Sequence, residues 1–194
     1  MRVWDAVPTV VRAPLTRSLY KHRMTCGRFT AIALGVTIFN TMTALPAAGI
    51  AETEMKGSGS AMEGDVVSVK GSMIRLRGID APDPGQTCRT LRSVEYDCFS
   101  AARAQLQQML DLGEVTCIAK EQDRNQNYIG VCRVLGKDLS AAMLVRGWAF
   151  AYSRLSTAYG GLEARAQARK AGMWAGRVEA PWLWRTRKLN DQTD

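Results

Sequence analysis

One short stretch of the chain combines residue types that could hold a cation and a phosphate. It reads RLRGIDAPDPGQTC and places Arg75, Asp80 and Asp83 within nine residues. Carboxylate oxygens are preferred ligands of hard cations such as Ca²⁺, and a guanidinium can grip a phosphate through paired N–H groups. A solvated turn with surface charges is the simpler alternative. The elements around the stretch, and the residues that they bring to it, distinguish the two.

The position of the single histidine limits the chemistry. His22 lies in residues 1–51, where basic residues precede the apolar run Thr30–Ala51, which small residues close. This is the pattern of an export signal, with Met1 or Met24 as the start. A retained membrane anchor is the alternative, because the run is almost long enough to span a bilayer. The rest of the chain has no histidine, so its chemistry has to use carboxylates, arginines, tyrosines or a bound ion.

Length and charge favour one mildly basic domain after this segment. The whole chain carries a formal charge of +8; residues 1–51 contain six Lys/Arg and one acidic residue, which leaves about +3 for the remainder. Such a charge permits a nucleic-acid partner without requiring one. Residues 52–61 are polar with a Gly/Ser cluster and are predicted to be a flexible leader. The folded domain is predicted at 62–187 and a polar tail at 188–194.

Alternating apolar and polar residues predict a hairpin around the first strand of the candidate site. With its turn at Gly71–Ser72, Val69 faces Ile74. The same register brings Asp65 close to the strand end that carries Asp80. Two acidic residues then converge from separate strands.

A second hairpin is predicted over residues 114–136, with a polar tip at Asp123–Asn127. This register sets Cys117 opposite Cys132, within disulfide range. Cys26 lies in the export segment, and the four cysteines that remain are an even number, which favours disulfides in an exported chain. Four cysteines allow three pairings, of which we choose Cys117–Cys132 with Cys88–Cys98. A four-thiolate zinc site is the alternative, but the spacing contains no C-x-x-C pair.

The helical segments complete the expected architecture. An amphipathic helix is predicted over residues 99–113, a second before Gly147, a short strand at Trp148–Tyr152 and a last helix ending near Gly172. The order of elements predicts an α+β, mainly β fold: a five-stranded OB-fold barrel with about three flanking helices. Barrels of this type commonly bind oligonucleotides or oligosaccharides.

These residues together resemble the staphylococcal nuclease (thermonuclease) family, from about Gly64 to Arg185. The matching pieces are Gly64–Asp65, Ile74–Asp83, Gln86 with Cys88, Asp123–Arg124, Gly147–Tyr152, Glu163, Ala166, Gly172–Trp174 and Pro181–Arg185. The resemblance implies an OB barrel with three helices. It also supports the disulfide pairing, since exported members often carry the same four cysteines.

The resemblance implies Ca²⁺-dependent hydrolysis of DNA and RNA phosphodiesters. Asp65 and Asp80 match the calcium aspartates, and Ala81 offers its backbone carbonyl where the family often has threonine. Arg75 matches the first phosphate arginine. Asp83 stands where the family has the glutamate that serves or orients the base, with a side chain one methylene shorter.

The largest departure from the family lies at the tip of the second hairpin. Asn127 stands where the family has its second phosphate arginine, and an amide carries no charge to stabilise the transition state. Arg124 or Arg133 could supply that charge from a neighbouring position. The tryptophans are expected to pack in or beside the core.

Three functional hypotheses therefore stand. The first is an exported, monomeric phosphodiesterase acting on single-stranded DNA or RNA with Ca²⁺, weakened by Asn127, and touching a membrane only if residues 1–51 are retained. The second is a degenerate relative that binds nucleic acid or another polyanion without cutting it. The third is an envelope interaction module. We favour the first narrowly.

Overall fold

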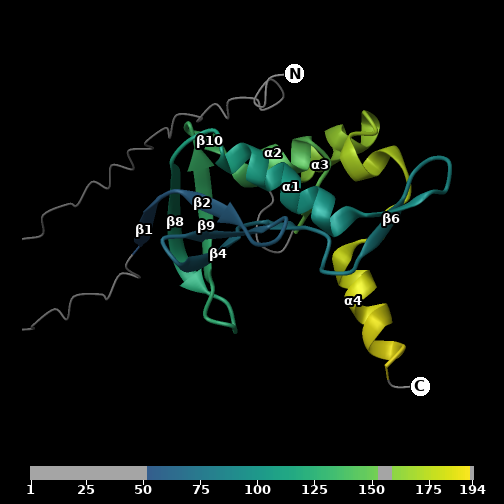
Figure 1. Cartoon of the computed structure of the whole chain (residues 1–194), viewed down its shortest axis with the longest axis horizontal. Helices are drawn as coiled ribbons and strands as arrows, with labels where there is room; N and C mark the ends of the chain where they lie inside the picture. Colours follow the sequence, from purple (N-terminus) through teal and green to yellow (C-terminus); the bar gives the residue numbers. More distant parts are fainter. Residues whose placement is uncertain (1–51, 153–158, 193–194) are drawn as a thin grey trace, which may run out of the picture. The chain divides into compact units, whose positions relative to one another are not determined.

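A computed structural model describes residues 52–152 and 159–192, which form an α+β domain built on a curled sheet (Figure 1). The sheet has the order β1–β8–β9–β4–β3–β2, and β10 pairs with β9. Its neighbours are antiparallel except for β4 and β9, which run parallel. The OB-fold class expected from the sequence is confirmed. The predicted export segment, residues 1–51 with His22, lies outside the described residues.

The strands are short. The main sheet contains β1 (Thr53–Gly57), β2 (Gly59–Ala61), β3 (Val66–Val69), β4 (Ser72–Leu76), β8 (Val115–Gln122), β9 (Tyr128–Val134) and β10 (Lys137–Asp138). Two further pairs lie outside it: β5 (Ile79–Asp80) with β11 (Phe150–Ala151), and β6 (Thr87–Arg89) with β7 (Glu95–Asp97).

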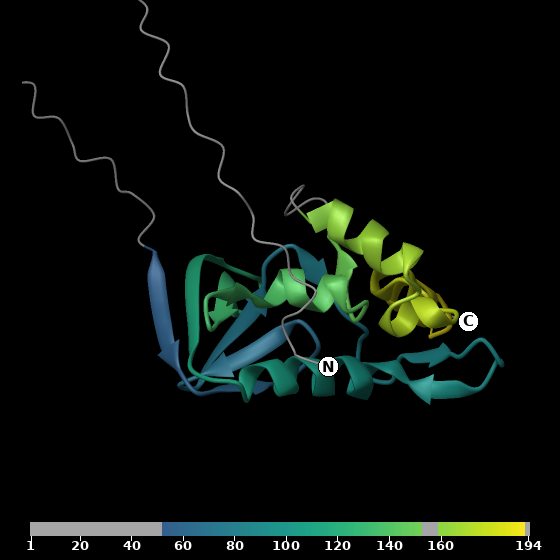
Figure 2. The ribbon, with the colours of Figure 1, turned by 90° about the horizontal axis from the view of Figure 1, so that it is seen from above.

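Helices α1 (Cys98–Leu110) and α2 (Leu139–Val145) pack against the sheet, and α3 (Gly160–Ala168) packs on α2. A 3₁₀ turn at Gly172–Ala175 follows, and α4 (Pro181–Asn190) projects from the domain (Figure 1). All seven residues of α2 are buried, because it packs on β9 and on both α1 and α3 (Figure 2). Asp97 and Asp138 cap α1 and α2 by accepting hydrogen bonds from backbone N–H groups of their first turns.

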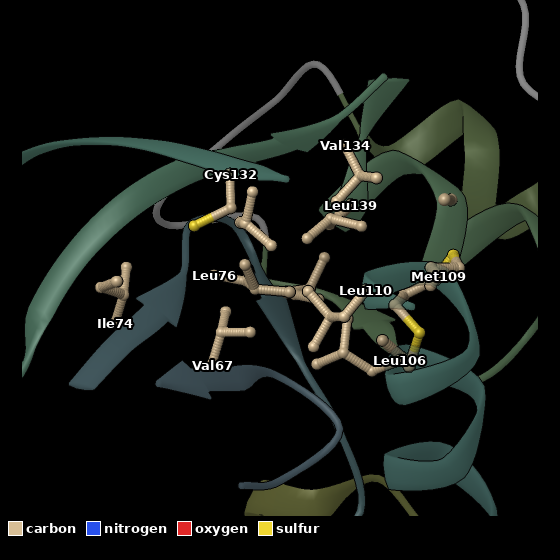
Figure 3. Packing of buried hydrophobic residues seen from close by; sticks show 14 of the residues in the cluster. Val67, Ile74, Leu76, Leu106, Met109, Leu110, Cys132, Val134 and Leu139 are labelled. Atoms are coloured by element: carbon tan, nitrogen blue, oxygen red, sulfur yellow. The ribbon is translucent and has the colours of Figure 1, made fainter. Parts of the chain in front are cut away.

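The core lies between β3, β4, β9 and α1. Figure 3 shows Leu76 pointing toward Leu110, with Val67 and Ile74 on β3 and β4 and Leu106 on the facing helix; these side chains are almost completely buried. The apolar stripe predicted on the first helix is the face that α1 buries, through Ala102, Leu106, Met109 and Leu110. This packing fixes β3 and β4, whose ends carry the candidate site residues.

The first hairpin differs from its predicted register by two residues. Its turn is Lys70–Gly71, both with positive φ (49° and 82°), so Val67 pairs with Ile74 and Val66 with Arg75. Positive φ at both central residues is the type I′ geometry, whose twist matches that of the flanking strands. Because a shift by two keeps each side chain on its face, the apolar face of the hairpin is still buried.

Both ends of the predicted domain need correction. Residues 52–61 are not a flexible leader: β1 pairs with β8 over five residues, and β2 pairs with β3. The backbone N–H of Ala61 also donates to Gln107 Oε1 of α1 at 2.8 Å. At the other end the polar tail begins later than residue 188, because α4 continues to Asn190.

Two disulfides cross-link the domain, and their pairing is the predicted one. Cys117 faces Cys132 across β8 and β9, and Cys88 joins Cys98 at the start of α1. All four cysteines are buried. In the described part of the chain, no helix has the length and apolar character needed to cross a membrane.

Candidate cation and phosphate site

Asp65 directly precedes β3, and one backbone and one side-chain hydrogen bond fix its position. Its backbone carbonyl accepts from Leu76 N–H at 2.7 Å, which ties it to the end of β4. Its side chain is only 4% exposed, and Oδ2 accepts from Arg75 Nη1 at 2.8 Å. The structure therefore pairs the buried Asp65 with Arg75, and β3 and β4 fix this pair.

Burial dominates the protonation of Asp65. It raises the pKa of the carboxyl to about 7; the Arg75 charge opposes the rise, and the neighbouring Asp80 adds to it. A buried carboxylate with one cationic partner and a like-charged neighbour gains from a further cation. The buried position of Asp65 therefore favours a cation site over the alternative of an exposed, solvated turn.

Asp80 reaches the same region from a different pair of strands. It ends β5, which pairs with β11 so that Phe150 lies opposite Asp80. Asp80 and the following Ala81 are both buried. Ala81 also packs closely on Gly64: a Cβ built on Gly64 would lie 2.7 Å from that of Ala81. The glycine before Asp65 thus allows the two acidic segments to approach each other.

A tight turn places Asp83 beyond Asp80. Gln86 N–H donates to the Asp83 carbonyl at 2.9 Å, with Pro84 and Gly85 (φ 84°) at the positions that a type II turn favours. The fully buried Gln86 side chain accepts from Asp83 N–H and donates to the Glu179 carbonyl at 2.7 Å. The turn is thereby fastened to the segment that leads into α4.

Arg185 of α4 joins this site, although the sequence reasoning gave it no role there. Its Nη2 donates to Asp80 Oδ2 at 2.7 Å, and its Nη1 donates to Asp83 Oδ2 at 2.7 Å and to Asp80 Oδ1 at 3.3 Å. One guanidinium thus bridges two carboxylates. Burial raises the pKa of Asp83, and the Arg185 charge opposes that rise.

The tip between β8 and β9 is closed by its own side chains. Asp123 Oδ1 accepts from the N–H groups of Asn125 and Asn127, and Oδ2 accepts from Asn127 Nδ2 at 3.1 Å. Burial acts to raise the pKa of Asp123, but these hydrogen bonds outweigh it and lower the pKa. Asn127 therefore fastens the turn, and it does so beside Asp123, which lies 3.7 Å from Arg75 Nε.

The proposed substitutes for the second arginine lie elsewhere. Arg124 is exposed on the tip, and Arg133 is exposed on β9. No contact among the described residues joins either side chain to Asp65, Asp80 or Asp83. The structure brings Asp65, Arg75, Asp80, Ala81 and Asp83 into one region and leaves Arg124 outside it.

The donor chemistry of the region fits Ca²⁺, although no group of three or more His, Cys, Asp or Glu in the described residues is arranged to hold an ion. Asp65 and Asp80 supply hard carboxylate oxygens and Ala81 a carbonyl. Five carboxylates surround two guanidinium groups: Arg75 contacts Glu63, Asp65 and Asp123, and Arg185 contacts Asp80 and Asp83. This excess of negative charge favours binding of a cation over binding of a phosphate without a cation.

A signal for Arg185 was present in the sequence. Three acidic residues, Asp65, Asp80 and Asp83, were placed together with only Arg75 to balance them, which implies a second cation. The ion pair spans 105 residues, so local patterning could not identify which arginine supplies it.

Comparison with known proteins indicates the family of this chain. The family model "Staphylococcal nuclease homologue" matches residues 73–176. A relative from Rhizobium meliloti (strain 1021), the succinoglycan biosynthesis protein ExoI, is 27% identical over 146 residues, which cover 74% of this chain and 76% of the relative. The family supports a nuclease-like or nucleic-acid-related function. Because its model matches more than half of the chain, the protein belongs to the staphylococcal nuclease homologue family.

Proposed function

We propose that this protein is an exported, Ca²⁺-dependent phosphodiesterase that hydrolyses single-stranded DNA or RNA with reduced efficiency. The observation that carries the proposal is the convergence of buried Asp65 and Asp80 from separate strand pairs, with Arg75 hydrogen-bonded to Asp65. Such a convergence of hard oxygen ligands and a guanidinium is what metal-assisted cleavage of a phosphodiester requires.

Each residue has a distinct part in this proposal. Asp65, Asp80 and the Ala81 carbonyl hold the cation, which supplies charge to polarise the phosphate when it is bound. Arg75, with a side chain 33% exposed, donates to the phosphate oxygens as negative charge develops. Asp83 either accepts the proton of the attacking water itself or orients that water for attack. Its shorter side chain and its bond to Arg185 both limit that role.

The reduction in efficiency is assigned to Asn127. Its side chain is engaged with Asp123 and brings no positive charge to the phosphate. Loss of a transition-state donor typically costs about 10²–10³ in rate. Asn127→Arg should therefore raise cleavage, although it also removes a hydrogen bond from the turn.

The test is cleavage of single-stranded DNA and RNA by the purified protein, with Ca²⁺ and with chelator. Cutting that requires Ca²⁺, disappears in Asp80→Ala and rises in Asn127→Arg supports the proposal. The matched control is Asn125→Arg, which adds the same charge on an exposed part of the same turn. Equal activation by both arginines would mean general electrostatic attraction and would contradict the assigned role of position 127.

A binding protein without nuclease activity is the second candidate. It is favoured by the engagement of both site arginines with carboxylates, which leaves neither guanidinium dedicated to a phosphate. Its ligand would be nucleic acid or another polyanion, and OB barrels also bind oligosaccharides. The name of the Rhizobium relative connects that protein with succinoglycan biosynthesis. Calcium-dependent binding without cutting by the parent protein would select this candidate.

Export is tested separately. Residues 1–51 carry the signal pattern, and the disulfides suit an oxidising compartment. Cell fractionation with N-terminal mass determination should find the mature protein outside the cytoplasm and shortened near Ala51. A full-length chain in the membrane fraction would indicate the anchor instead.

A further inference from the structure

Arg185 occupies one of the two carboxylates that the proposed cation site needs. Both oxygens of Asp80 accept from its guanidinium, at 2.7 and 3.3 Å, and the Asp80 side chain is only 11% exposed. A divalent cation on Asp80 would have to share these oxygens with a positive group in direct contact. Two cations on one shielded carboxylate repel each other strongly, because solvent screening is weak there.

The element that carries Arg185 is loosely attached. Pro181 is the only buried residue of α4, and Leu183 and Leu189 are 55% and 65% exposed. Figure 1 shows α4, in yellow, projecting from the rest of the domain. Trp182 also contacts the body, edge-on against Phe150 with ring centroids 5.5 Å apart. On so exposed a helix, the three hydrogen bonds of Arg185 contribute substantially to docking.

The start of α4 is anchored separately. Gln86 donates to the Glu179 carbonyl just before the helix. Loss of the Arg185 bridge would therefore release the helix while leaving its first residues in place. A helix fixed at its first residues and held along its length by a charge pair can exist in two states, docked and released.

We propose that Arg185 is an internal competitor of the divalent cation, so that α4 docks when the site is empty and is released when Asp80 binds metal. This inference rests on the proposed cation site but not on nuclease activity. Arg185 then sets the calcium concentration at which the site fills. The coupling is reciprocal: calcium weakens α4 docking by the same factor by which docking weakens calcium binding.

The first experiment measures Ca²⁺ affinity by titration calorimetry on the full-length protein, without nucleic acid. Arg185→Gln should bind Ca²⁺ about tenfold more tightly than the parent, within the usual range of such couplings. Arg185→Lys should lie between them, because it keeps the charge but loses the paired N–H donors. Arg187→Gln is the matched control, because Arg187 lies on the same helix but pairs with Glu179 at 2.8 Å. The Ca²⁺ affinity of this variant should equal that of the parent.

The second measurement is hydrogen–deuterium exchange of residues 181–190. Saturating Ca²⁺ should speed exchange there in the parent, and Arg185→Gln should show fast exchange with or without Ca²⁺. Unchanged or weaker Ca²⁺ affinity in Arg185→Gln overturns the inference, as does an absence of Ca²⁺ binding in both proteins. Slow exchange at saturating Ca²⁺ overturns it too. The expected affinities without any cutting of nucleic acid would contradict the nuclease proposal alone.

Discussion

At the scale of single residues, the site is defined by how each arginine is shared among acidic groups. Arg75 is bound to the buried Asp65 and lies near Asp123, and Arg185 is divided between Asp80 and Asp83. Removing either arginine leaves a shielded carboxylate without its counter-charge. The two losses differ, because Asp65 is the more deeply buried acid.

Arg75→Gln should lower cleavage about 10²-fold or more, since it removes a charged donor to the phosphate. It should also raise the pKa of Asp65 further above about 7, because burial then acts without its main opposing charge. Arg77→Gln is the matched control: its side chain is similarly exposed, 35% against 33%, and it pairs with Glu121. Initial cleavage rates and NMR titration of Asp65 measure both effects; equal losses in the two variants would remove Arg75 from the site.

Asp65 should make the metal-free protein less stable as pH rises. The folded state holds its proton up to about pH 7, whereas the unfolded carboxyl releases it near 4. The free energy of unfolding should therefore fall between about pH 4 and 7, by on the order of 4 kcal/mol from this group. Urea unfolding across this range should show the decline in the parent and not in Asp65→Asn. A parallel decline in both would assign it to other groups.

At the scale of elements, the least predictable parts are the polar strands at the sheet edges. β1 and β2 contain few apolar residues, and their pairing with β8 and β3 depends on neighbours distant in sequence. Their loss should nevertheless cost several kcal/mol, since β1 closes one edge of the sheet and Met55 packs against the core. Deletion of residues 1–61 should lower the urea midpoint strongly compared with deletion of residues 1–51. Equal urea midpoints would support the prediction that residues 52–61 are a flexible leader.

Sequence patterning predicted elements whose faces are set by local periodicity. The stripe of α1 and the Cys117–Cys132 register followed from a period of 3.6 and from hairpin geometry. The first hairpin turn was misplaced because Lys70, a residue that rarely adopts positive φ, precedes Gly71. The sequence analysis assigns no helix to residues 181–190, although Pro181 is a helix-start signal. Arg185 was not predicted as a site residue because its partners, Asp80 and Asp83, are distant from it in the sequence.

At the scale of the whole molecule, the acidic site contrasts with a net positive domain. Residues 52–194 carry about +3, yet five carboxylates gather around two guanidinium groups at the site. Under the proposed function, the basic remainder of the surface would attract a polyanion, and the site would accept it once a cation offsets the carboxylates. Substrate binding would then depend on metal binding.

Metal binding should consequently stabilise the whole domain. At 100 times its dissociation constant, a ligand that binds only the folded state adds about 2.7 kcal/mol to the free energy of unfolding. The gain should be smaller at pH 6 than at pH 8, because a proton competes for Asp65, whose pKa is about 7. Urea unfolding with Ca²⁺ or chelator at both pH values measures this, with Asp80→Asn as the variant that loses the gain. A gain retained in Asp80→Asn, or one independent of pH, would place the calcium elsewhere on the molecule.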